Sequence, residues 1–293
     1  MAVYILSNPS SGNGRAVQVI SDLHEQYPKV VFKVFETKKI GDEEKIVTDI
    51  LKKFDEKYDQ FLIIGGDGTL SKVLKFWPRE LPFAYLAAGS GNDFAKSLGD
   101  LPQESVISAV LLSKKRPINL LVSDQGVAVN SFDLGFAAKT IALSERSKVK
   151  YLLKLLGLGR LSYIILGIRA LFSSKMVSIQ LEIDGQEQIL NDLFFFSIAN
   201  NRYFGGGITI WPESHVTTSN LTVVYAKNRG WFGNVKTLLS LICNNHHKSP
   251  NLVVQTGQSV GVRVLENSLA QIDGESFQIH EVAFTCQTRY LYY

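Results

Sequence analysis

Phe61-Leu62-Ile63-Ile64-Gly65-Gly66-Asp67-Gly68-Thr69-Leu70 is the stretch on which the interpretation of the whole chain depends. Its first four residues are apolar, a length that suits one buried β-strand. Three glycines around a single carboxylate follow, and a helix-compatible segment begins at Thr69. A strand that ends in a glycine-rich turn and opens a helix presents unpaired backbone amides to a phosphate group. Asp67 among those amides suits a Mg²⁺ ion that accompanies the phosphates, although an ordinary strand-to-helix turn fits the same pattern.

Residues 1–112 alternate between strand-like and helix-like segments. This alternation is typical of a parallel sheet with helices on both faces, and such sheets bind ligands outside the carboxyl ends of their strands. Loops rich in Gly, Ser, Asn or Asp follow three of the predicted strands, at Asn8–Gly14, Gly65–Thr69 and Gly89–Asp93. We therefore expect the three loops to meet at one edge of the sheet and to bind nucleotide phosphates.

The sequence changes in character after Ser113-Lys114-Lys115-Arg116-Pro117. Beyond this point short strand-like runs dominate, separated by Gly, Asn and Asp turns, which favours an antiparallel sandwich or barrel. Two helical regions interrupt the strands, near Ser144–Phe172 and Trp231–Ile242. We predict a doubly wound α/β nucleotide-binding domain over residues 1–118 and an antiparallel β-sandwich domain over residues 119–293. The last strand of the second domain could return to the first.

The overall composition is that of a globular protein of one or two domains, because 45% of the 293 residues are hydrophobic and 20% are charged. The N-terminus has no basic leader followed by a long apolar run, so we expect no signal peptide. The two cysteines, Cys243 and Cys286, form no disulfide framework, and the five histidines show no metal-ligand spacing. These features predict a cytoplasmic protein with reduced thiols.

A basic and apolar segment extends from residue 139 to residue 175, with eight basic residues against the single acidic residue Glu145. Its central part, Tyr151–Phe172, is strongly apolar, but three basic residues interrupt it. Each charge at a bilayer centre costs roughly 2.5–3.5 kcal/mol, so we expect no membrane span. Two alternatives stay open: an amphipathic helix pair packed on the second domain, or a surface that docks peripherally on the inner face of an anionic membrane. We expect no nucleic-acid partner and leave a homodimer open.

Four motifs occur along the chain in a recognisable order: Gly65–Thr69, Gly89–Asp93, Gly205–Gly207 with Pro212, and Asp273-Gly274-Glu275. Together they resemble the diacylglycerol kinase catalytic family, which includes bacterial diacylglycerol kinases and the sphingosine and ceramide kinases. The resemblance covers nearly the whole chain and is strongest to bacterial soluble members of about this length. The first motif alone also occurs in NAD kinases and phosphofructokinase-like enzymes, whereas the downstream motifs are specific to the lipid kinases.

The resemblance implies a role for each residue that matches a family motif. Asp273 would be the general base, with Glu275 beside it, and Asp67 would share in catalysis. Asp67 and Asp93 would belong to a Mg²⁺ network. ATP would be bound by the residues that match the Asn-Pro-x-x-Gly loop, the threonine after the second strand, the phosphate loop and the Gly-Thr-x-Asn-Asp segment. These residues are Asn8, Pro9, Ser10, Ser11, Gly12, Thr37, Gly65, Gly66, Asp67, Gly68, Thr69, Leu70, Lys72, Ser90 and Asn92.

The chemistry of phosphoryl transfer agrees with these roles, because the reaction needs aligned oxygens, neutralised charge and removal of the acceptor's proton. Asp67 would reach the phosphates through Mg²⁺, and Asp273 would take the proton from a lipid hydroxyl. Asp273 follows the apolar-alternating run Leu269–Ile272, so it stands at a strand end. Taken alone, Asp273-Gly274 fits a simple hairpin turn better than a catalytic site.

Three departures from the family pattern concern charge. The family usually has Glu where this chain has Lys72, close to the phosphates. Thr218 stands where many members have an Asp that helps to hold a structural Mg²⁺, so we expect that site, near His215, Thr218 and Asn220, to be lost. Asn119 replaces a further acidic residue. A hydroxyl or an amide is a poorer Mg²⁺ ligand than a carboxylate.

The predicted function is an ATP-dependent lipid kinase with Mg²⁺ as the metal, and diacylglycerol, converted to phosphatidic acid, is the preferred acceptor. The lipid would enter between the domains, near Gly205–Gly207. One alternative is an NAD kinase-like enzyme. Another is a catalytically weakened relative that binds lipid or nucleotide, which the three departures motivate.

Overall fold

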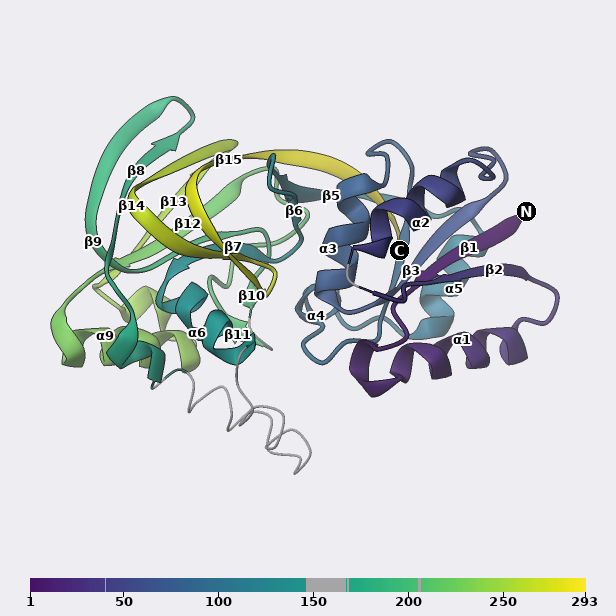
Figure 1. Cartoon of the computed structure of the whole chain (residues 1–293), viewed down its shortest axis with the longest axis horizontal. Helices are drawn as coiled ribbons and strands as arrows, with labels where there is room; N and C mark the ends of the chain where they lie inside the picture. Colours follow the sequence, from purple (N-terminus) through teal and green to yellow (C-terminus); the bar gives the residue numbers. More distant parts are fainter. Residues whose placement is uncertain (40, 146–166, 168, 205–206) are drawn as a thin grey trace.

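The computed structural model describes residues 1–39, 41–145, 167, 169–204 and 207–293, and they form two domains built on separate sheets (Figure 1). The first sheet is parallel, with the order β2-β1-β3-β4. Its strands are β1 (Ala2–Ser7), β2 (Val31–Glu36), β3 (Gln60–Gly65) and β4 (Ala84–Ala87). The helices of this domain are α1 (Arg15–Gln26), α2 (Asp42–Leu51), α3 (Asp67–Phe76), α4 (Asp93–Ser97) and α5 (Gln103–Leu111).

Strand β1 shows why helices cover both faces of this sheet. All six of its residues are buried, and successive side chains of a strand point to opposite faces. Tyr4 and Leu6 pack in one core with residues of α2 and α3, while Val3 and Ile5 pack in a second core with residues of α1 and α5. The predicted doubly wound α/β fold is therefore confirmed.

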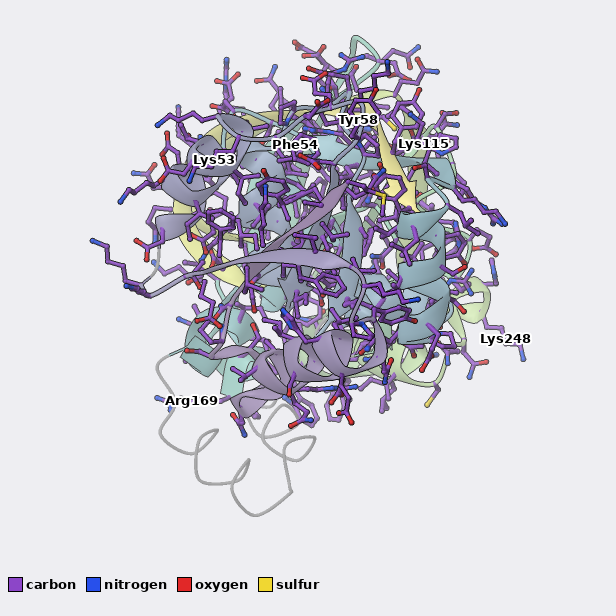
Figure 2. The ribbon with its side chains drawn as sticks, turned by 90° about the vertical axis from the view of Figure 1, so that its right-hand side faces the viewer. Lys53, Phe54, Tyr58, Lys115, Arg169 and Lys248 are labelled. Atoms are coloured by element: carbon purple, nitrogen blue, oxygen red, sulfur yellow. The ribbon has the colours of Figure 1, made fainter. Side chains whose placement is uncertain are left out.

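The sequence from Asp42 to Tyr58 has an amphipathic pattern that favours one helix, but α2 ends at Leu51. The chain turns after this residue and brings Phe54 against two aromatic rings, with centroid distances of 5.5 Å to Tyr4 and 5.3 Å to Trp77. Tyr58 is exposed, and it lies with Lys53 at the outer end of the first domain (Figure 2).

The second domain is an antiparallel β structure, as predicted. Strands β7 and β8 each pair with both β9 and β14, so these four strands close into a small barrel. The barrel strands are β7 (Ser131–Gly135), β8 (Val177–Ile183), β9 (Gln186–Ala199) and β14 (Ser259–Ile272). The strands outside the barrel are β5 (Lys115–Val122), β6 (Val127–Ala128), β12 (Leu221–Lys227), β13 (Leu252–Gly257) and β15 (Glu275–Tyr292), with a separate pair β10 (Tyr203–Phe204) and β11 (Ile208–Thr209).

Two runs that look like separate strands in the sequence, Val260–Leu265 and Ser268–Ile272, form the single strand β14. The pairing of β14 with β15 shifts register between Arg263 and Ser268. This bulge turns the strand, so that its first half pairs with β8 and its second half with β7. The bend allows one strand to serve two sides of the barrel and to end in the turn that carries Asp273.

The two domains share a core and a stretch of backbone pairing. The end of β15 pairs with β5, and Phe83, just before β4, exchanges hydrogen bonds with Tyr290 and Tyr292 at 3.0 and 2.8 Å. The buried Arg289 donates to the carbonyl of Trp77 at 2.8 Å. These contacts hold the Asp273 turn in a defined place relative to the first sheet.

The helices of the second domain lie below its strands in the view of Figure 1. They are α6 (Phe136–Glu145) and α9 (Gly230–Ile242), and residues 169–173 are helical as well. Most of the basic segment 139–175 lies outside the described residues, as do Gly205 and Gly206. Within the described ranges, none of the helices is long and apolar enough to cross a lipid bilayer.

Candidate active site

The loops that follow β1, β3 and β4 meet at the carboxyl edge of the first sheet. The loops after β3 and β4 touch backbone to backbone, since a Cβ added at Gly89 would lie 2.6 Å from Cα of Gly66. The loop after β1 is equally close, because a Cβ added at Gly12 would lie 2.1 Å from the carbonyl oxygen of Ala88. Nδ2 of Asn8 donates to Oγ1 of Thr69 at 3.3 Å. The structure therefore brings together the three loops whose convergence the sequence predicts.

Helix α3 begins inside this cluster, at Asp67. The first amides of a helix have no partner within it, and the positive end of the helix dipole lies behind them. Gly66 and Gly68, on either side of Asp67, have no side chains of their own to keep a phosphate from these amides. Thr37 joins the cluster from the end of β2, where its amide donates to the carbonyl of Ser7 at 2.9 Å.

The carboxylate of Asp67 ties the loops together. It accepts hydrogen bonds from the amide of Asp93 at 2.8 Å and from the amide of Phe94 at 3.3 Å, both at the start of α4. Burial, and then the nearby carboxylate of Asp93, raise the pKa of Asp67 to about 6. Two amides leave part of the acceptor capacity of a carboxylate free. Because both side chains carry negative charge, Asp67 and Asp93 repel each other, and a bound cation such as Mg²⁺ would relieve that repulsion.

Asp273 reaches the same region from the second domain, at the two-residue turn between β14 and β15. Its φ of 47° followed by 91° at Gly274 is the geometry of a tight hairpin turn. Its carboxylate accepts the amides of Val129, Asn130 and Ser131 at 2.7, 2.8 and 3.1 Å. Burial raises the pKa of Asp273 to about 7, although these three hydrogen bonds lower it. The negative charge of Asp67 raises it further.

Glu275 and Lys72 form an ion pair that connects the two domains. A Cβ added at Gly68 would lie 4.0 Å from Oε1 of Glu275, so the phosphate loop and the Asp-Gly-Glu turn are in contact. Gly68, Lys72, Asp273 and Glu275 all line one cavity of about 330 Å³. The replacement of an acidic residue by Lys72 is thus matched within the structure by an acidic partner.

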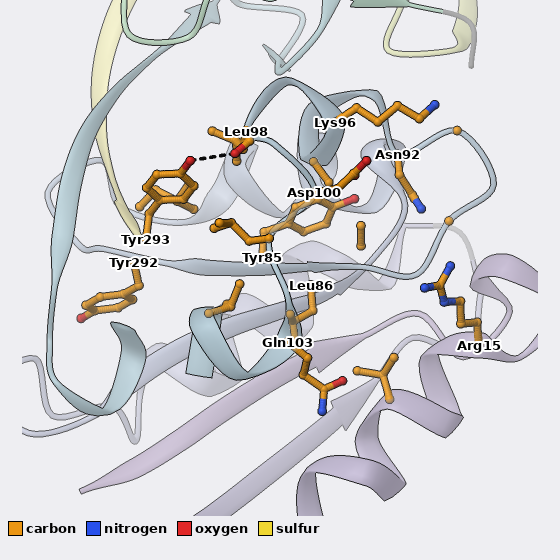
Figure 3. A pocket seen from close by; sticks show the side chains of 18 of the residues that line it. Arg15, Tyr85, Leu86, Asn92, Lys96, Leu98, Asp100, Gln103, Tyr292 and Tyr293 are labelled. Carbon is orange, nitrogen blue, oxygen red and sulfur yellow. Dashed lines mark hydrogen bonds between the residues drawn. The ribbon is translucent and has the colours of Figure 1, made fainter. Parts of the chain in front are cut away.

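A second cavity, of about 470 Å³, lies at the end of β4 (Figure 3). Ser90 and Asn92 line it, as do Arg15 from α1 and Lys96 from α4, with the two C-terminal tyrosines on the opposite side. Oδ1 of Asn92 is buried without a hydrogen-bond partner among the described residues. A buried acceptor without a partner is rare in folded proteins, and a donor on a bound nucleotide would satisfy it.

The loop from His215 to Asn220, where we expect the family's structural Mg²⁺ site to be lost, is held in place by hydrogen bonds. Nδ2 of Asn119 donates to the carbonyl of Thr218 at 2.9 Å, and Oγ1 of Thr218 donates to the carbonyl of His215 at 2.7 Å. Oγ1 of Thr288 donates to Oδ1 of Asn119 at 2.9 Å. The amide and hydroxyl that replace the family's carboxylates therefore connect this loop to β5 and β15 directly.

The backbone amides that hold Asp273 were not predicted from the sequence, because every residue except proline has an amide and the residue type does not mark them. One signal was present in three buried polar residues that lie just before β7 and just after β9, namely Asn130, Asn200 and Asn201. Both Asn200 and Asn201 donate from Nδ2 to the carbonyl of Val129, at 2.9 and 3.2 Å. They position the segment that supplies the three amides.

Gly89→Ala is expected to weaken nucleotide binding, because the new methyl group cannot fit beside Cα of Gly66. The two loops must separate, at a cost of about 1–3 kcal/mol. We expect the KM for ATP to rise about tenfold or more and the Tm to fall by a few degrees. Gly261→Ala is the matched control, since its Cβ would lie 3.4 Å from Cβ of Glu182, an ordinary contact in a strand far from the loops. Equal effects of both substitutions would contradict this account.

Two family models match the chain, the diacylglycerol kinase catalytic domain over residues 2–122 and the YegS C-terminal NAD kinase beta sandwich-like domain over residues 136–291. A protein named diacylglycerol kinase from Staphylococcus saprophyticus is 23% identical over 280 residues, which cover 92% of this chain and 88% of the relative. A crystal structure of a diacylglycerol kinase from Bacillus anthracis matches with a TM-score of 0.69 at 16% identity, over 100% of this chain and 96% of the other.

A crystal structure of an NAD kinase from Archaeoglobus fulgidus in complex with ATP shares the fold more distantly. Its TM-score is 0.51 at 14% identity, and the match covers 99% of this chain and 93% of the other. At these identities the solved structures show a shared fold, whereas the two family models account for nearly all of the sequence. Given those models, and the meeting of the glycine loops with the Asp-Gly-Glu turn, the chain belongs to the diacylglycerol kinase catalytic domain family, with a YegS-type C-terminal domain.

Proposed function

We propose that this protein is an ATP-dependent lipid kinase that transfers the γ-phosphate of ATP to a lipid hydroxyl, with diacylglycerol as the preferred acceptor and phosphatidic acid as the product. Membership of the family implies ATP as the phosphoryl donor. One observation carries the proposal: the phosphate loop with Asp67 and the turn with Asp273 face each other across the domain junction.

The glycine loops and the start of α3 would bind the phosphates of ATP through backbone amides. Ser90 and Asn92 would contact the nucleotide from the loop after β4. Asp67 and Asp93 would hold Mg²⁺, which would neutralise phosphate charge during the transfer. Lys72 lies on the second turn of α3, beside Gly68, so its ammonium group can reach a phosphate oxygen and shares the cavity with Asp273.

Asp273 would act as the general base. Three backbone amides fix the orientation of its carboxylate, and its raised pKa makes it a better proton acceptor than an ordinary aspartate. The acceptor's hydroxyl would lie in the cavity that Asp273 lines, which Phe277 and Phe76 make partly apolar. The proton would pass from that hydroxyl to Asp273 as the oxygen attacks the γ-phosphate.

Diacylglycerol is preferred as the acceptor because curated relatives that match 92% of this chain bear the name diacylglycerol kinase. The basic segment 139–175 would bring the protein to the cytoplasmic, inner face of an anionic membrane, where such a lipid is found. The protein would associate with that surface peripherally.

The experiment is a product assay with labelled ATP, Mg²⁺ and a panel of lipids in mixed micelles. The panel contains diacylglycerol, monoacylglycerol, a sphingoid base, phosphatidylglycerol and a polyprenol. We expect labelled phosphatidic acid as the main product. Labelling of another lipid would correct the acceptor, and nucleotide binding without any labelled lipid at any Mg²⁺ concentration would identify a catalytically weakened relative.

An NAD kinase-like activity is the second candidate, because the C-terminal domain model is NAD kinase-like and an NAD kinase shares the fold. The same assay with NAD⁺ in place of lipid separates the two functions. Formation of NADP⁺ without labelled lipid would replace the lipid kinase proposal.

The rate is expected to depend on pH through Asp273. A general base is active when deprotonated, and the pKa of Asp273 is about 7. The value of kcat/KM should therefore be low at pH 5.5, rise through a midpoint near pH 7 and level off above it. The profile is measured at saturating Mg²⁺. A flat profile between pH 5.5 and 8.5 would show that Asp273 is not the group whose ionisation limits the rate.

A further inference from the structure

The buried face of helix α9 is only partly apolar, although Leu241 and Leu238 pack against the core there. Its buried residues include two polar ones, Asn234 and Thr237, beside Leu241. The side chain of Asn234 accepts from the amide of Arg229 at 3.1 Å, and Oγ1 of Thr237 accepts from Nδ2 of Asn251 at 2.8 Å. Hydrogen bonds to the protein thus satisfy the polar residues of the inner face, so α9 is held in this orientation by specific contacts.

The outward face of α9 is apolar. Phe232 is 83% exposed, Ile242 61%, Leu239 53% and Trp231 47%. At 100° per residue these four side chains fall within one sector of about 100°. A surface helix of a globular protein normally turns such a sector toward the core, and an exposed apolar patch of this kind marks an interaction site.

A second exposed aromatic residue extends the patch beyond α9. Phe172, in the helical stretch of residues 169–173, is 70% exposed, and its ring stacks on that of Trp231 with a centroid distance of 6.0 Å. The ring of Trp231 in turn meets that of Phe232 edge to face at 4.9 Å. The three rings, with Leu239 and Ile242, are called the α9 patch below.

Cations border the α9 patch. Lys236 is exposed four residues after Phe232, and Arg169 is exposed three residues before Phe172, so each cation shares a helix face with an exposed ring. Arg169 points outward at the margin of the molecule (Figure 2). The sequence from residue 192 to residue 266 contains six Lys or Arg residues and three acidic ones, Asp192, Glu213 and Glu266. Glu213 pairs with His247 at 2.9 Å.

We propose that the α9 patch is a membrane-docking surface, whose aromatic and aliphatic side chains insert at the interface of an anionic lipid bilayer while the bordering cations contact lipid phosphates. Tryptophan and phenylalanine beside Lys and Arg, on a helix that lies flat on a surface, are the composition of interfacial membrane helices. The excess of positive charge favours anionic lipid over a neutral surface. The proposal deepens the proposed lipid kinase function by adding a place of attachment remote from Asp273, and it rests on that function only for the reason to bind lipid.

The test is sedimentation with vesicles of phosphatidylglycerol and phosphatidylcholine, without ATP. The double variant Trp231→Ser/Phe232→Ser is compared with Ile189→Ser/Leu265→Ser, which removes two other exposed apolar side chains, 66% and 51% exposed, from β9 and β14. We expect the first variant to lower the partition coefficient roughly tenfold or more, and the control to stay within about twofold of the unaltered protein.

Fluorescence gives a second measurement that does not depend on a destabilising substitution. Of the three tryptophans, Trp77 is buried at 2% exposure and Trp211 is partly buried against the core beside His246 and His247, so Trp231 is the one expected to reach the acyl chains. Lipids brominated in their acyl chains should quench the emission of the unaltered protein, and Trp231→Phe should remove most of that quenching while vesicle binding is retained. Quenching that is unchanged in Trp231→Phe would overturn the proposal.

The remaining outcomes separate docking from catalysis. If the unaltered protein binds vesicles through the α9 patch but labels no lipid, docking stands and the lipid kinase function fails. If turnover of a water-soluble short-chain diacylglycerol is unchanged in Trp231→Ser/Phe232→Ser while turnover on vesicles falls, both are supported. If that variant binds vesicles normally but turns a dimer into a monomer, the patch is an interface between two copies of the chain and the docking proposal is wrong.

Discussion

Asp273→Asn is expected to lower kcat about a thousandfold while leaving the fold intact, because removal of a general base typically costs 10²- to 10⁴-fold. Asparagine has nearly the shape of aspartate and tolerates the left-handed backbone at this position, where φ is 47°. Its amide cannot accept a proton from the acceptor's hydroxyl. The measurement is the rate of lipid phosphorylation at saturating ATP, with nucleotide affinity determined separately.

The expected result has a structural reason beyond the lost base. The Asp273 carboxylate accepts hydrogen bonds from three backbone amides. Those of Asn130 and Ser131 bind Oδ1, and that of Val129 binds Oδ2. Asparagine keeps one acceptor oxygen and turns an NH₂ group toward a backbone donor, so one hydrogen bond is lost at a cost of about 1–3 kcal/mol. We therefore expect a measurable fall in Tm together with the loss of activity.

Asp184→Asn is the matched control. Asp184 also precedes a glycine in a hairpin turn, between β8 and β9, with a φ of 50°. Its Oδ1 accepts the amides of Gln258 and Ser259, each at 2.8 Å. Because both amides bind the same oxygen, asparagine can keep both hydrogen bonds, so this substitution should cost less stability than Asp273→Asn and leave kcat within about twofold of the unaltered protein. If both variants lost activity in proportion to their stability, Asp273 would be a structural turn residue and not a base.

Lys72→Met should lower kcat/KM for ATP about ten- to a hundredfold, the range expected when a hydrogen bond to a charged group is lost. Lys72 lines the same cavity as Gly68 and Asp273, and its side chain is 28% exposed; Lys75 also lines that cavity, but its ammonium group donates to the carbonyl of Gln125 at 3.2 Å. Without it, Glu275 loses its partner and adds an unbalanced negative charge near the phosphates. The assay is the dependence of rate on ATP concentration at fixed lipid.

The role of the Lys72–Glu275 pair is separated from that of Lys72 alone by a double-mutant cycle with Glu275→Gln. If Lys72 acts on ATP directly, Lys72→Met should cost about the same with Glu or Gln at position 275. If it serves mainly to neutralise Glu275, the double variant should recover most of the loss. Lys52→Met is the control, because Lys52 lies at the C-terminal end of α2, away from the cavity, and forms an exposed ion pair with Asp49 at 3.2 Å. A rate unaffected by Lys72→Met would contradict both roles.

Much of the first domain was predictable because its signals are local. An apolar run of strand length, such as Phe61–Ile64, followed by glycines and a helix, specifies both a buried parallel strand and the loop after it. Since the carboxyl ends of parallel strands lie at one edge, the meeting of three loops followed from their order along the chain. The end of α2 was not predictable in the same way, because the contact of Phe54 with Tyr4 and Trp77 depends on which strands become neighbours.

Asp273 shows the limit of the sequence most clearly. The residues themselves identify Asp273-Gly274 as a turn, and resemblance to a family was needed to suggest a base. Its pKa is raised by burial and by the charge of Asp67 in the other domain, while three backbone amides of a segment more than 140 residues earlier in the chain lower it in part. None of these neighbours is local in the sequence. Its titration therefore depends on the bulge in β14 and on the return of β15 to the first sheet.

The stretch Phe61–Leu70 by its own residues specifies a strand, a glycine turn and a helix start, because φ/ψ freedom and unpaired amides are properties of short segments. Its partners came from the tertiary structure. Packing places Gly89 against Gly66, aims the carboxylate of Asp67 at the start of α4, and brings Glu275 into an ion pair with Lys72. The sequence determines which side chains carry charge, but the distance between two charges is set only when the chain folds. That distance gives Lys72, which departs from the family's pattern, an acidic partner in Glu275.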